Sequence, residues 1–307
     1  MRKAPFVIAS SAFAFTLACS EPSEPLADSR EAPSSDPATK PSPTTPSPPE
    51  TKPEPLPPEP PEPKPTGVVS VHQASADHGM SYRAGASARF GSKVGPSADT
   101  CTTTTHGPCT VSVCSSPTNT GSPPPSAGRV WFNLPARVLE LPQQRDGTYA
   151  EAAYEERLFQ PNDKLSASAE GATFPAFSLE VSAPPNVTML FPALDNVLQA
   201  EPIDRKKPYT LKWQTASSGA APVIVSATIL ATKPPVTTLH VCEAKLEDGS
   251  LTIPQSAVAL IGETKGVQAG GMLFVSTSRR KTMSVGSEVA RFEVISTHHS
   301  AVIEPFN

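Results

Sequence analysis

A proline-rich run limits which part of this chain can fold. Residues 20–66 hold 17 of the 38 prolines, interleaved with Glu, Ser, Thr and Lys and with almost no apolar side chains. Each proline fixes φ and removes a backbone donor, and a folded core needs apolar surface to bury, so this run cannot form one. We therefore expect a disordered, extended linker over residues 19–66 and a folded part that begins near residue 67.

The segment before the linker has the three parts of a secretory signal. A basic start, Arg2 and Lys3, precedes an apolar run over residues 6–17, and the small Ala18 follows it. A helix that crosses a bilayer needs about 20 apolar residues, whereas this run is shorter and is broken by serine and threonine. Residues 1–18 are therefore predicted to be a signal peptide that is removed.

Cys19 stands directly after this signal, in the stretch Leu17-Ala18-Cys19-Ser20. The stretch resembles the lipobox of bacterial lipoproteins, and the resemblance covers residues 1–20 only. In that family the cysteine thiol receives a diacylglyceryl group, and the new amine is acylated with a fatty acid such as palmitate. The resemblance implies that Cys19 holds the chain on a membrane, since two or more acyl chains bind durably. Ser20 after it implies the outer membrane, facing the periplasm or the cell surface.

Charge and motifs narrow the expected functions. The chain carries 25 Lys and Arg against 29 Asp and Glu, a formal net charge of −4, so no basic excess exists to bind nucleic acid. It has no G-x-S-x-G, H-E-x-x-H, Gly-rich phosphate loop or C-x-x-C motif. We expect no catalytic residues and no cofactor, and as partners the membrane, through the lipid, and a glycan or an envelope protein.

Beyond the linker, short apolar or alternating runs are separated by Gly, Pro, Asn and Asp, a pattern typical of an all-β domain. The predicted strands cover residues 68–73, 82–90, 109–113, 128–134, 137–141, 164–169, 177–182, 187–190, 209–215, 223–231, 238–246, 272–278 and 289–296. One helix is predicted over residues 254–260, with Thr252 as its cap. The length allows one large domain or two, and we favour two β-sandwich lobes, residues 67–183 and 184–307.

The two tryptophans are predicted to play different roles. Trp213 alternates with polar neighbours in a run that also contains Tyr209 and Leu211, so it should lie on the buried face of its strand. Trp131 falls on the face opposite Val130 and Phe132, together with Arg129 and Asn133. These three residues are therefore a candidate ligand-binding group, because an exposed tryptophan beside polar groups can stack on a sugar ring. Packing of Trp131 beneath a loop or between lobes is the alternative.

Four cysteines follow Cys19: Cys101, Cys109, Cys114 and Cys242. An even number in an exported chain suggests two disulfides. A bridge from 109 to 114 is excluded, because the ends of an extended six-residue strand lie about 16 Å apart. Of the two pairings that remain, we favour 109 to 242 in the core and 101 to 114 near the surface, and a free buried Cys242 is the alternative.

Some of the same residues admit a metal-site interpretation. Cys101, His106, Cys109 and Cys114 offer four N and S ligands, the number that tetrahedral zinc takes. The adjacent His298 and His299 would point to opposite faces of a strand and are predicted to form an exposed tail.

The order of the segments leads to a functional hypothesis. We expect a membrane-anchored envelope lipoprotein that displays a non-catalytic β-sandwich module for binding or structural work. A carbohydrate-binding or carbohydrate-active module is the alternative, and a metal-binding protein is a further one.

Overall fold

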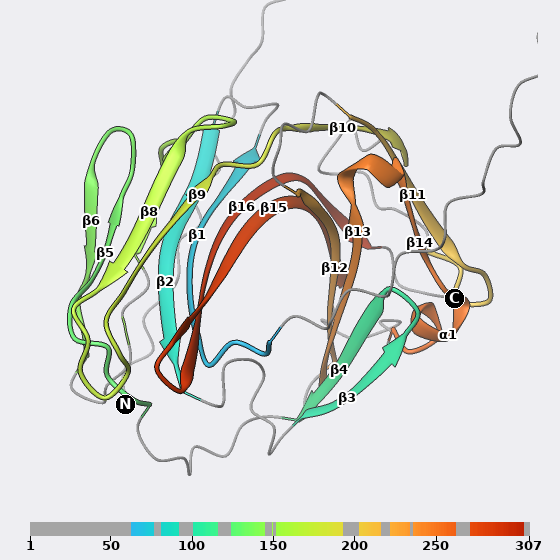
Figure 1. Cartoon of the computed structure of the whole chain (residues 1–307). Coiled ribbons are helices and arrows are strands. Elements are labelled where there is room, and N and C mark those ends of the chain that lie inside the picture. Colours follow the sequence, from blue (N-terminus) through green and yellow to red (C-terminus); the bar gives the residue numbers. More distant parts are fainter. Residues whose placement is uncertain are drawn as a thin grey trace, which may run out of the picture. The chain divides into compact units, whose positions relative to one another are not determined.

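The structure is a computed structural model. It describes residues 63–76, 81–91, 101–115, 124–144, 149, 152–192, 203–215, 222–233, 236–261 and 271–303. The predicted signal peptide, Cys19 and nearly all of the predicted linker lie outside the described residues. The chain divides into Met1–Glu59 and Pro60–Asn307, and every described residue belongs to the second unit. This unit is all-β, as predicted (Figure 1).

Nine strands form one large sheet that curves into an arch (Figure 1). Its spatial order is β3 (Cys101–His106), β4 (Cys109–Ser115), β13 (Val236–Lys245), β12 (Ile224–Lys233), β15 (Gly271–Val285), β16 (Glu288–Ile303), β1 (Gly67–Ala76), β2 (Ser81–Phe90) and β7 (Ala152–Tyr154). β1 and β16 pair in parallel, and the other neighbours in this sheet pair antiparallel.

Two smaller antiparallel sheets lie outside the arch, one at each side (Figure 1). The first has the order β6 (Val138–Leu141), β5 (Val130–Asn133), β8 (Lys164–Ala169) and β9 (Phe177–Ser182). The second has the order β10 (Val187–Phe191), β11 (Tyr209–Thr215) and β14 (Ser250–Ile253). The short 3-10 helix η2 (Leu246–Asp248) precedes β14, and the short α-helix α1 (Gln255–Val258) follows it. The two smaller sheets thus cover two separate parts of the outer face of the large sheet, which gives a sandwich-type arrangement.

The large sheet takes strands from both sides of the predicted boundary between residues 183 and 184. β1 to β4 and β7 come before the boundary, and β12, β13, β15 and β16 come after it. The first core contains Phe292 from the later part of the chain, and the second contains Cys109 from the earlier part. The two cores are therefore not two consecutive pieces of sequence.

The first core lies between the four-stranded sheet and the part of the large sheet formed by β1, β2 and β16. Aromatic rings dominate it: Phe90 lies 4.8 Å from Phe174 and 6.1 Å from Phe177, and Phe132 lies 6.0 Å from Phe292, between ring centroids. Tilted and edge-on ring pairs of this kind add to the free energy gained by burial.

The second core lies under the three-stranded sheet and contains Trp213, which confirms that this tryptophan is buried. Trp213 is 3 % exposed, and its indole Nε1–H donates to the carbonyl oxygen of Leu246 at 2.9 Å. A buried tryptophan needs such an acceptor for its one polar group. Leu211 and Ile253 pack around it in the same core.

Each of the thirteen predicted strands is present, and three further strands, β3, β7 and β14, were not predicted. The helix is shorter than predicted and Thr252 does not cap it. Pro254 occupies the N-cap position, while the Thr252 hydroxyl lies 3.0 Å from that of Thr210 on the neighbouring strand. Because Thr252 belongs to β14, its side chain points across the sheet and not along the helix.

Candidate functional site

Both disulfides have the favoured pairing. Cys101 is bonded to Cys114, and Cys109 is bonded to Cys242. β3 and β4 pair so that Cys101 stands opposite Cys114, and β4 and β13 pair so that Cys109 stands opposite Cys242. Each bridge therefore joins two neighbouring strands of the large sheet, and the second of them lies in the core.

The zinc interpretation of Cys101, His106, Cys109 and Cys114 is corrected by this pairing. All three cysteines are in disulfides, so none can supply the thiolate that zinc needs. His106 instead shares a hydrogen bond of 3.1 Å with the Thr104 hydroxyl. Among the residues that the structure describes, no group of three or more His, Cys, Asp or Glu side chains could hold a metal ion.

The predicted group of Arg129, Trp131 and Asn133 lies on the outer face of the four-stranded sheet. Trp131 is partly buried and stands opposite Glu140 on β6 and Ser168 on β8. Asn133 donates to the Ser166 hydroxyl at 2.9 Å, and the Ser168 hydroxyl donates to that of Ser178 at 2.9 Å. A row of hydroxyl groups thus runs beside the indole.

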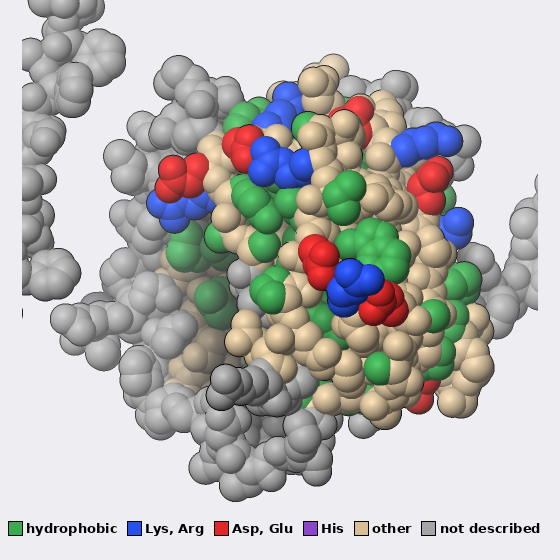
Figure 2. Space-filling view, turned by 90° about the vertical axis from the view of Figure 1, so that its left-hand side faces the viewer, with side chains coloured by type: hydrophobic (Ala, Val, Ile, Leu, Met, Phe, Trp, Pro, Cys, Tyr) green, Lys and Arg blue, Asp and Glu red, His purple; other side chains and the backbone are tan. Residues whose placement is uncertain are grey.

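Arg129 is held at the edge of this face by Glu170. Their charged groups lie 2.6 Å apart, and this contact raises the pKa of Arg129 and lowers the pKa of Glu170. Figure 2, which faces this side of the molecule, shows hydrophobic side chains scattered among polar and charged ones.

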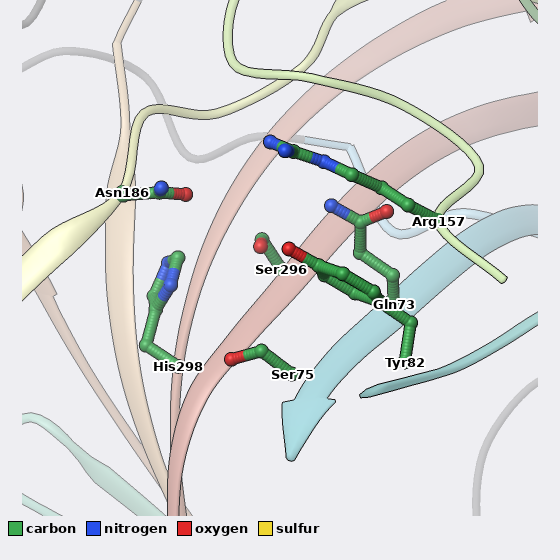
Figure 3. Close-up of a pocket in the computed structure, with 7 residues that line it drawn as sticks. All are labelled: Gln73, Ser75, Tyr82, Arg157, Asn186, Ser296 and His298. Carbon is green, nitrogen blue, oxygen red and sulfur yellow. The ribbon is translucent and has the colours of Figure 1, made fainter. Parts of the chain in front are cut away.

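The described part of the chain also contains a small pocket that the sequence did not predict. Its volume is about 210 Å³. It is lined by Gln73 and Ser75 of β1, Tyr82 of β2, Ser296 and His298 of β16, Arg157 after β7 and Asn186 before β10 (Figure 3). Every lining residue carries a polar or charged group.

The parallel pairing of β1 and β16 brings polar side chains of the two strands together in the pocket. On the covered face of β1, Val69 and Val71 are followed by Gln73, and in β16 Phe292 and Val294 are followed by Ser296. In the observed register Val71 stands opposite Val294 and Gln73 stands opposite Ser296. The apolar ends of the two strands therefore meet in the first core, and their polar ends meet in the pocket.

Gln73 fixes the wall of the pocket. Its amide nitrogen donates to the carbonyl oxygen of Phe159 at 3.1 Å, and its amide oxygen accepts from the backbone N–H groups of Leu158 and Phe159 at 3.3 Å each. Because the side chain is 4 % exposed and uses both ends of its amide, it ties the segment after β7 to the sheet. This segment carries Arg157.

Arg157 lies over the ring of Tyr82. Its Cζ atom is 5.6 Å from the ring centroid, and its Nε–H donates to the carbonyl oxygen of Phe159 at 2.9 Å. A guanidinium over an aromatic face is attracted by the ring. Since Nε is already used, the two Nη groups remain to contact a ligand.

His298 is not part of an exposed tail, contrary to the prediction. It lies in β16 as the extra residue of a bulge, since Ser276 pairs with Thr297 and Val275 pairs with His299. Burial, and to a smaller extent the charge of His299, lowers the pKa of His298 to about 4. His298 is therefore neutral at neutral pH.

The hydrogen bonds of Thr277 fix which nitrogen of His298 carries the proton. The Thr277 hydroxyl lies 3.0 Å from the carbonyl oxygen of Pro185 and 2.7 Å from His298 Nε2. A carbonyl can only accept, so the single hydroxyl proton goes to Pro185 and the hydroxyl accepts from Nε2–H. The lone pair of His298 is thus on Nδ1.

Among the residues that the structure describes, the pocket holds no hydroxyl that donates to the His298 ring. An activated nucleophile is a hydroxyl or thiol that donates to a base, whereas Thr277 donates to a backbone carbonyl. Within the described residues, Ser75 and Ser296 have no side-chain hydrogen bond to His298. The described residues of the lining also include no carboxylate that could orient the imidazole.

No protein-family model matches the chain, and a search of curated proteins finds no relative.

Proposed function

We propose that this chain is a lipid-anchored envelope protein that binds a small polar ligand. Acylated Cys19 would hold it on the membrane, residues 19–66 would act as a linker, and the head, residues 67–307, would present the pocket. The observation that carries the binding role is a pocket on which polar side chains converge from five separate segments, with Tyr82, Asn186 and Ser296 making no side-chain hydrogen bond among the described residues.

The membrane location rests on the lipobox resemblance around Cys19. Ser20 in the next position supports sorting to the outer membrane, facing the periplasm or the cell surface. Within the described ranges there is no helix with the length and apolar character required to span a bilayer.

The anchor is tested by replacing its cysteine. We expect Cys19→Ala to abolish incorporation of labelled palmitate and to move most of the protein from the membrane pellet to the soluble fraction, because the acyl chains that supply membrane affinity would be missing. Ser20→Ala is the matched control and should keep both label and membrane association. A Cys19→Ala protein that stays in the pellet as before would contradict the anchor.

A glycan-binding role for the outer face of the four-stranded sheet is the second candidate. It is favoured by the partly exposed ring of Trp131 beside the ordered hydroxyls of Ser166, Ser168 and Ser178. A sugar can stack on an indole while its hydroxyls bond to such a row. An envelope protein is the other partner that this face could contact.

One screen separates the two candidates. The full chain in detergent micelles is tested against a library of small metabolites and a glycan array, with two variants beside it. Asn186→Trp places a bulky ring at the exposed rim of the pocket, and Trp131→Ala removes the indole from the other face.

The screen has a distinct result for each site. If the pocket is the binding site, we expect metabolite hits that Asn186→Trp abolishes and Trp131→Ala leaves unchanged. The reverse pattern, with glycans retained by the Asn186→Trp chain only, would assign function to the outer face. Hits that neither variant affects would contradict both candidates.

A further inference from the structure

The described residues of the pocket carry one formal positive charge and no negative one. Arg157 is the only Lys or Arg among the described lining residues, and these include no Asp or Glu. Among the described residues Arg157 has no carboxylate partner, and its contacts are the Phe159 carbonyl and the Tyr82 ring. A cation without a countercharge, held in one orientation, favours a bound anion.

Neutral donors surround the same space. Figure 3 shows the Arg157 guanidinium, the Asn186 amide, the Tyr82 hydroxyl and the Ser296 hydroxyl turned toward one another, with the His298 ring beside them. Within the described residues, no side-chain hydrogen bond joins these neutral groups to His298 or to each other. The neutral groups are those of Asn186, Tyr82, Ser296 and Ser75. They are available to an oxygen atom of a ligand.

The charge of the pocket limits the charge of its ligand. Arg157 supplies one full positive charge, and its two free Nη groups form one edge of the guanidinium, which fits the two oxygens of a carboxylate. His298 adds no second charge at neutral pH, because burial lowers its pKa to about 4. A phosphate dianion would keep one charge unpaired here, so a planar monoanion is the better match.

His298 also selects for a donor in the ligand. Its Nδ1 has a lone pair and no partner among the described residues. A hydroxyl group next to the carboxylate could donate to it.

We propose that the pocket binds a small 2-hydroxy carboxylate, with Arg157 pairing with the carboxylate and His298 accepting from the neighbouring hydroxyl group. This inference rests on the proposed binding role of the pocket and names its ligand class. The volume of about 210 Å³ agrees with a ligand of this size.

The test is a calorimetric titration of the full chain in detergent micelles at neutral pH. The probes are lactate, acetate, inorganic phosphate and glycerol. We expect lactate to bind most tightly, acetate more weakly because it lacks the donor, and phosphate and glycerol more weakly than acetate. Arg157→Gln should weaken lactate at least about tenfold, since it removes a charge-assisted contact.

Two further variants separate a charge effect from a change in folding. Arg83→Gln is the matched control, because Arg83 is an exposed arginine next to Tyr82 that points away from the pocket, and it should not change lactate affinity. Asn186→Asp keeps Arg157 and its contacts but places a negative charge at the exposed rim, and it should also weaken lactate at least about tenfold.

Three results would overturn the inference: no detectable lactate binding, equal affinity for lactate and glycerol, or unchanged lactate affinity in Arg157→Gln and Asn186→Asp. If metabolites of another class bind and Asn186→Trp abolishes them, the binding role of the pocket stands and only the carboxylate assignment falls.

Discussion

Replacing both Cys109 and Cys242 by alanine is expected to lower the free energy of unfolding by about 5 kcal/mol, against about 3 kcal/mol for the pair Cys101 and Cys114. The first bridge joins residues 133 positions apart and the second joins residues 13 positions apart. A longer closed loop removes more conformational entropy from the unfolded chain. The first pair is also buried, at 1 % and 0 % exposed, so its removal leaves space in the core.

The two double variants and the unchanged chain are compared by urea unfolding, followed by circular dichroism without reducing agent. Each double variant is the control for the other, because both remove two cysteines and one bridge. Equal losses of stability, or a larger loss for the 101 and 114 variant, would contradict the expectation.

His240→Leu is expected to stabilise the protein, and increasingly so as the pH falls. His240 is 0 % exposed and lies on the same face of β13 as Cys242, which belongs to the second core. Neither ring nitrogen of His240 has a hydrogen-bond partner among the described residues. A buried polar group without a partner costs about 1 to 3 kcal/mol. Leucine has a similar volume and no such cost, so the variant should gain on the order of 1 kcal/mol at pH 7.

The pH dependence follows from the same burial. Burial, and to a smaller extent the charge of His106, lowers the pKa of His240 to about 4, whereas a histidine in an unfolded chain has a pKa of about 6.5. Between these values the unfolded chain binds a proton that the folded chain does not. The free energy of unfolding therefore falls as the pH is lowered from about 6.5 to about 4, by on the order of 3 kcal/mol.

The quantity to measure is the gap in the free energy of unfolding between His240→Leu and the unchanged chain, taken by urea unfolding at about pH 7, 5.5 and 4. His298 contributes in the same direction to both proteins, so the gap between them isolates His240. The gap should widen toward pH 4. Thr238→Val is the control, because Thr238 is a buried polar residue on the same face of β13 but has no titratable group, so the difference that it makes should not change with pH. A His240→Leu gap that does not change with pH would contradict the buried neutral histidine.

The strands and the covalent bridges could be read from the sequence because each depends on local pattern. Alternation placed Trp213 in the core, and the face shared by Cys109, Val111 and Val113 pointed to the pairing with Cys242. β3 could not be found in this way, because its four consecutive threonines are exposed on both faces. It is a strand because β4 offers it a hydrogen-bonding edge and a disulfide.

The pocket could not be predicted, because it depends on how distant strands align. The polar residues Gln73 and Ser296 each follow two apolar residues on one strand face. This change from apolar to polar side chains is the one local pattern in the sequence that relates to the pocket. Only the parallel register brings the two signals side by side. Arg157 and Asn186 then come from segments outside regular structure, where residue periodicity gives no information about direction.

The place of β1 in the large sheet affects how the protein can be made. β1 is the first strand after the linker, yet it lies in the interior, between β2 and β16. During synthesis β1 can pair with β2 early, but its other edge stays open until residues 288–303 have followed. Such distant contacts form slowly. A chain that stops before β16 would lack the strand that joins the two parts of the sheet, and not merely one of its borders.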